Sequence, residues 1–74
     1  MNGKESSILL KAAEIEFGVE KVMQVISTQN LNRTELTALM QYQFKLPENH
    51  ELKLNHSVLV KGLANLLFNL PESE

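Results

Sequence analysis

Two histidines and one serine are the first residues to consider for catalysis or metal binding. His50 and His56 stand six positions apart, which matches no common zinc spacing, and no set of further ligands lies nearby. Ser57 follows His56 directly, but a nucleophilic triad needs three groups that converge in space, and neighbours in sequence lack that geometry. A solvated loop explains His50, and a position near a helix N-terminus explains His56. We therefore expect no metal site and no catalytic residue.

Glu14, Glu16 and Glu20 form a carboxylate-rich stretch. On one helix Glu16 and Glu20 would share a face while Glu14 points elsewhere, so a solvated charged surface is the expected outcome. The three glycines are scattered, which excludes a glycine-rich phosphate loop. The chain has no Cys, which excludes disulfides, thiolate zinc sites and thiol nucleophiles. We expect a non-enzymatic protein without a cofactor or a small-molecule substrate.

The fold that positions these side chains is restricted by the length and composition of the chain. It has 74 residues, 43% of them hydrophobic, which predicts a single small helical domain over residues 1–74. A chain of this size removes only about 60% of its unfolded surface from water, so its own core is marginal. Packing against a second chain is a common way to gain the missing stability.

A helical pattern runs through the first third of the chain. Its leading apolar residues are spaced alternately four and three positions apart, as on one face of a helix. They are Ile8, Ala12, Ile15, Val19, Val22 and Ile26. A glycine inside a helix costs about 1 kcal/mol relative to alanine, so the helix bends at Gly18 or two helices meet there. Because the pattern continues in phase across Gly18, we expect one long helix over about residues 6–29.

The strongest local signal in the chain begins at Asn32. With Asn32 as the N-cap, Glu35 falls at the third helical position, where its carboxylate can reach back to the cap amide. Pro47 prevents simple continuation of this helix. The pattern predicts a second helix over residues 33–46.

Residues 47–55 are predicted to form a loop, and residues 71–74 a solvated acidic tail. Between them, residues 56–70 are apolar around most of a helix, which is typical of a helix buried on more than one side. Two neighbouring helices cannot cover such a surface, so a second copy or another protein is expected to cover the rest. The predicted fold is all-α: a three-helix antiparallel or orthogonal bundle completed by dimerisation.

Abundant apolar surface in a chain with little chemistry predicts a small regulator or adaptor that acts by protein–protein interaction, as a homodimer. The expected contact residues are Ile8, Ile15, Val22, Ile26, Leu59, Leu63, Leu66, Leu67 and Leu70. A subunit or chaperone of a larger assembly, which would dock its last helix on a different protein, remains an open alternative.

A DNA-binding transcriptional regulator that uses the helix after Asn32 is a further alternative. Its DNA contacts would be Arg33, Thr34, Gln41 and Gln43. The net charge of −2 disfavours nucleic acid, because phosphate contacts supply most of such affinity. Helix capping also explains the polar residues at the start of this helix without DNA.

Targeting signals are not apparent. The apolar run after the first seven residues is too short for a signal-peptide core, and no run approaches the roughly 20 residues of a membrane span. The absence of cysteine fits a reducing compartment. We expect a cytoplasmic protein without a membrane partner.

Residues 17–68 combine an apolar helix, a polar pivot, a second helix and an apolar last helix. The residues that mark them are Gly18, Val22 and Ile26, then Asn30-Leu31-Asn32-Arg33-Thr34-Glu35-Leu36, then Leu39, Met40 and Phe44, then Gly62, Leu66, Leu67 and Phe68. In this arrangement the chain resembles the small AriR-type regulators of biofilm formation and acid resistance in enteric bacteria. The resemblance implies an all-helical homodimeric regulator that contacts signalling proteins or, less directly, DNA. It implies no catalytic residue.

Overall fold

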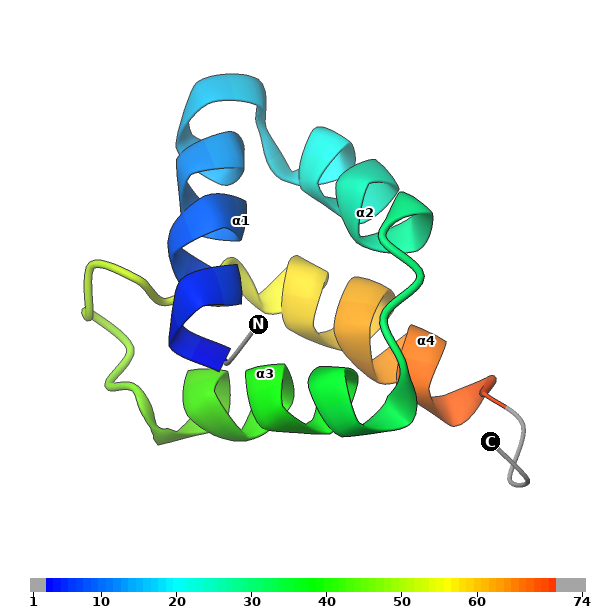
Figure 1. The fold of residues 1–74 in the computed structure, drawn as a ribbon. Helices are drawn as coiled ribbons and strands as arrows, with labels where there is room; N and C mark the ends of the chain where they lie inside the picture. Colours follow the sequence, from blue (N-terminus) through cyan, green and yellow to red (C-terminus); the bar gives the residue numbers. More distant parts are fainter. Residues whose placement is uncertain (1–2, 71–74) are drawn as a thin grey trace.

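The computed structural model describes residues 3–70, and all regular secondary structure in this range is helical (Figure 1). The elements are α1 (Gly3–Phe17), α2 (Val19–Thr28), α3 (Arg33–Lys45), the π-helix η1 (Val58–Ala64) and α4 (Asn65–Phe68). The predicted all-α class is confirmed. The tail predicted for residues 71–74 lies outside the described residues.

The predicted continuous first helix is wrong, because the chain breaks at Gly18 into α1 and α2. Gly18 has a φ of 96° and a ψ of 172°, a backbone conformation that residues with a Cβ rarely adopt. Its amide donates a hydrogen bond to the Glu14 carbonyl oxygen and so closes α1. Figure 1 shows the chain turning back at this point. The predicted count of three helices is therefore too low.

The predicted start of α3 is confirmed in detail. The Asn32 side-chain oxygen accepts a hydrogen bond from the Glu35 amide at 2.8 Å, and the Glu35 carboxylate accepts one from the Asn32 amide at 3.0 Å. These two bonds satisfy amides that a helix start otherwise leaves unpaired. The helix ends at Lys45, one residue before the predicted end.

The last helix covers residues 56–68, and we refer to it as the C-terminal helix. Its central part, η1, has π-type hydrogen bonding, whereas the sequence pattern predicts an ordinary α-helix over 56–70. Gly62 lies within η1 and packs against α2, and a Cβ placed there would make ordinary contact with Cδ1 of Ile26 at 3.6 Å. The apolar pattern cannot distinguish the two helix types, because residues that are apolar around most of a helix fit either one.

The core lies where the C-terminal helix passes through the space framed by α1, α2 and α3 (Figure 1). Nine apolar side chains, each at most 2% exposed, form it: Leu10, Val22, Ile26, Leu36, Leu39, Leu54, Val58, Leu59 and Leu63. Full burial of a side chain of this size contributes about 1.5–3 kcal/mol. Among these residues α1 supplies only Leu10, so this helix must be held by other means.

Polar contacts and close backbone packing hold α1. Gln43 of α3 is fully buried and donates from Nε2 to Ser7 Oγ of α1 at 2.9 Å. Further along α1, the Lys11 ammonium donates to the Lys53 carbonyl oxygen at 2.7 Å. The Glu14 carboxylate accepts from the Asn55 amide at 2.8 Å. The inward side of α1 therefore carries mainly small and polar residues.

Candidate functional site

The residues considered for catalysis do not converge. His50 accepts a hydrogen bond from the Leu52 amide through Nδ1 at 3.0 Å, which stabilises the local turn. His56 is exposed at the start of the C-terminal helix, and the Ser57 amide donates to the Asn55 side chain at 2.9 Å. Within residues 3–70 no three His, Cys, Asp or Glu side chains come close enough to hold a metal ion.

The three carboxylates of residues 14–20 also have different surroundings in the structure. Glu14 accepts a 2.6 Å hydrogen bond from the Lys11 ammonium, in addition to the bond from Asn55. Glu16 and Glu20 are exposed, and they lie on different helices because of the break at Gly18. Glu14 thus takes part in holding α1, and Glu16 and Glu20 lie on the solvated surface.

The proposed DNA-contact residues do not share a surface, since Gln43 lies in the core. Its Nε2 donates to Ser7 and to the Leu52 carbonyl oxygen at 2.8 Å, and its Oε1 accepts from the Leu54 amide at 2.8 Å. The prediction that Gln43 could contact DNA is therefore wrong. The sequence gives no local sign of this role, because its partners lie 36, 9 and 11 positions away.

The remaining members of that set are on the surface of α3. Thr34 and Gln41 are exposed, and Arg33 is half-buried and donates from its guanidinium to the Leu70 carbonyl oxygen at 3.3 Å. This contact joins the start of α3 to the end of the C-terminal helix. Arg33 thus has a structural role whatever else it binds.

The expected interface residues separate into two groups. Four of them belong to the core of the chain itself, namely Val22, Ile26, Leu59 and Leu63. In this conformation they cannot contact a partner, which corrects that part of the predicted interface. Leu66, Leu67 and Leu70 are half-buried against the core, and Ile8 and Ile15 are exposed. Only this second group is accessible.

The outward side of α1 is an apolar surface. We define the α1 face as Ile8, Leu9, Ala12 and Ile15, which are all exposed and occupy one side of a helix at positions i, i+1, i+4 and i+7. Ile15 is 76% exposed. Glu5 and Glu16 lie on the same side of α1, one toward each end of the face. Contiguous apolar surface of this kind is typical of a binding site.

A second apolar surface lies between α3 and the C-terminal helix. Two adjoining hollows of about 520 and 530 Å³ share Met40 and Leu67, and we call the combined surface the α3 groove. Its lining residues are Arg33, Thr37, Met40, Gln41, Phe44, Lys45, Ala64, Leu67, Phe68 and Leu70. Phe44 is 58% and Phe68 88% exposed. Among the lining residues within 3–70 there is no carboxylate, although the chain as a whole is acidic.

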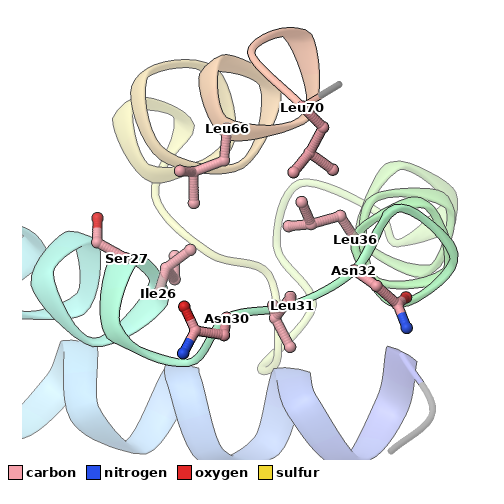
Figure 2. A pocket seen from close by; sticks show the side chains of 8 residues that line it. All are labelled: Ile26, Ser27, Asn30, Leu31, Asn32, Leu36, Leu66 and Leu70. Atoms are coloured by element: carbon pink, nitrogen blue, oxygen red, sulfur yellow. The ribbon is translucent and has the colours of Figure 1, made fainter. Parts of the chain in front are cut away.

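A smaller cavity of about 320 Å³ opens where the end of α2 meets the start of α3 (Figure 2). Figure 2 shows Leu36, Leu66 and Leu70 directed toward the same space. The polar residues of its lining are Ser27, Asn30 and Asn32. Ser27 donates to the Met23 carbonyl oxygen and Asn32 caps α3, and none of the described residues that line the cavity is titratable. It offers no acid or base for chemistry.

Among residues 3–70, no helix has both the length and the apolar character that crossing a bilayer requires. Comparisons with models of protein families, with curated proteins and with solved structures find no match to this chain. Its function is therefore inferred from the two apolar surfaces, the α1 face and the α3 groove.

Proposed function

We propose that this protein is a small non-enzymatic regulator or adaptor that acts by protein–protein interaction, as a homodimer. The observation that carries the proposal is the α1 face, where Ile8, Leu9 and Ile15 point to solvent on a helix whose inward side is already satisfied. No packing requirement within residues 3–70 explains apolar residues at these positions.

The energetics favour covering this face. Burying an Ile or Leu side chain gains about 1.5–3 kcal/mol relative to full exposure, so a partner that covers half-exposed residues gains part of that from each. A folded chain of this size has a marginal core, and association supplies the burial that the monomer lacks. The AriR-type resemblance likewise implies a homodimeric regulator.

The DNA-binding alternative loses support from the geometry. Gln43 is unavailable, which leaves Arg33, Thr34 and Gln41, and of these only Arg33 is charged. One cation does not supply the several phosphate contacts on which such binding depends. We assign the protein to protein binding and, because it lacks cysteine, to the cytoplasm.

Sedimentation equilibrium over a wide concentration range tests the proposal. We expect the wild type to populate a dimer and the double variant Ile8→Glu, Ile15→Glu to remain monomeric with unchanged helicity. The matched control is the double variant Gln24→Glu, Gln29→Glu. It adds two carboxylates at exposed positions, one within α2 and one directly after its end. A wild type that stays monomeric at every concentration would contradict the homodimer.

A further inference from the structure

We infer that the two apolar surfaces bind each other between copies, so that the α1 face of one molecule lies in the α3 groove of another. This inference rests on the self-association proposed above and specifies its geometry. The contact is heterologous, since two different surfaces meet, and it closes as a dimer when each copy places its α1 face in the groove of the other, so that the contact occurs twice. It matches the arrangement of an amphipathic helix in a hydrophobic groove, in which apolar residues spaced at i, i+4 and i+7 fill the groove.

The charges of the two surfaces are complementary. In the part of the chain that the structure describes, the α3 groove is lined by Arg33 near one end and Lys45 near the other, and by no carboxylate. The α1 face is bordered by Glu5 and Glu16. Lys45 and Glu16 are both exposed, and neither has an ion-pair partner among residues 3–70.

The two surfaces also match in length. At a rise of about 1.5 Å per residue, Glu5 and Glu16 lie about 17 Å apart along α1. Arg33 and Lys45 lie about 18 Å apart along α3 by the same measure. A helix presenting the α1 face can therefore place one carboxylate near each end of the groove. Met40, near the middle of the groove, has a flexible side chain that adapts to the shape of a partner.

A symmetric contact between two α1 faces satisfies the charges less well. Antiparallel pairing about the centre of the face brings Glu5 of one copy close to Glu16 of the other, and like charges at that distance repel. Lys4 lies beside Glu5 and offsets part of this repulsion. The groove, in contrast, meets both carboxylates with cations and covers Phe44 and Phe68 as well.

Single-surface variants test the heterologous contact. Phe68→Glu alters the groove, and Ile8→Glu, Ile15→Glu alters the face. We expect each to weaken self-association by about tenfold or more, as for residues at the centre of an interface. The matched control is Phe17→Glu, which changes a 64% exposed phenylalanine on neither surface and should leave the dissociation constant unchanged. Circular dichroism and urea unfolding establish that all variants fold.

Mixing the two variants gives the decisive result. Each variant retains the surface that the other has lost, so a labelled face variant and a labelled groove variant should associate by fluorescence transfer more tightly than either does with itself. If the wild type associates but Phe68→Glu has wild-type affinity and the mixture shows no gain, this inference is overturned while self-association stands. If the wild type does not associate at all, both proposals fail.

Charge reversal provides an independent measurement. Lys45→Glu should weaken association by about threefold at low salt, within the range of exposed ion pairs. Adding Glu16→Lys or Glu5→Lys to the same chain should restore the affinity, and the carboxylate that restores it identifies the end of α1 that lies near Lys45. If Lys45→Glu weakens association and neither Glu16→Lys nor Glu5→Lys restores the affinity, the proposed pairing of charges is contradicted.

Discussion

Ile15 of α1 and Ile26 of α2 belong to one continuous apolar pattern in the sequence, yet Ile15 is 76% exposed and Ile26 is 1% exposed. The break at Gly18 separates them. After the break, Val22 and Ile26 turn toward the core, whereas the members of the pattern before it, Ile8, Ala12 and Ile15, face solvent. The comparison shows that periodicity identifies a helix face but does not say what that face contacts.

The two helices are also held differently. α2 buries apolar side chains against the C-terminal helix, as an ordinary amphipathic helix does. α1 is held through Ser7, Lys11 and Glu14, whose partners are Gln43 and the segment before the C-terminal helix. Because polar contacts already position α1, the residues of the α1 face remain available for another molecule.

The largest expected effect comes from removing the polar attachment of α1. Gln43→Ala leaves the Leu54 amide, the Leu52 carbonyl and Ser7 without their partner, in addition to opening a cavity. We expect a loss of about 4 kcal/mol in the free energy of unfolding, measured by urea denaturation at fixed protein concentration. Gln41→Ala, an exposed neighbour on α3, should cost less than about 0.5 kcal/mol. Equal effects of the two variants would show that α1 is not held by Gln43.

Matched isoleucine truncations compare the two helices directly. Ile26→Ala should lower the free energy of unfolding by about 3 kcal/mol, because it creates a cavity in the core. Ile15→Ala should change the stability of the monomer by less than about 0.5 kcal/mol. Thermal or urea unfolding of dilute samples separates these outcomes. A large loss for Ile15→Ala in a monomeric sample would mean that α1 packs its apolar side inward.

Glycine substitutions probe the break itself with a smaller expected effect. A side chain at Gly18 meets no atom within 4 Å, so Gly18→Ala should cost about 2 kcal/mol through its positive φ alone. Gly62→Ala should instead stabilise by about 0.5–1 kcal/mol, since its Cβ would make ordinary contact with Ile26 and the residue is helical. If Gly18→Ala were neutral, α1 and α2 could join into the single helix that the sequence pattern predicts.

The sequence predicts the start of α3 because the relevant interactions are local. Asn32 and Glu35 are three positions apart, and their capping box depends on no distant part of the chain. The all-α class is predicted for a similar reason, since each helix has its own periodic pattern. The break at Gly18 is not predicted, because a pattern that stays in phase is compatible with a bend or a turn.

The role of Gln43 could not be predicted, because its partners are brought together only by the folded chain. The interface prediction fails in part for the same reason. Leu59 and Leu63 have the residue types of an interface, but α2 and α3 already cover them. The α3 groove combines residues from two separate segments, so no single stretch of sequence reveals it.

The central claim is that the α1 face is covered by another copy of the protein while the corresponding residues of α2 are not. The chain has three isoleucines, Ile8 and Ile15 on the α1 face and Ile26 in the core, so selective labelling of isoleucine methyl groups gives one NMR signal for each. In spectra recorded over a dilution series, the Ile8 and Ile15 signals should shift at concentrations around the dimer dissociation constant. The Ile26 signal should keep its position throughout. Signals of Ile8 and Ile15 that do not change from the most concentrated to the most dilute sample would contradict the account.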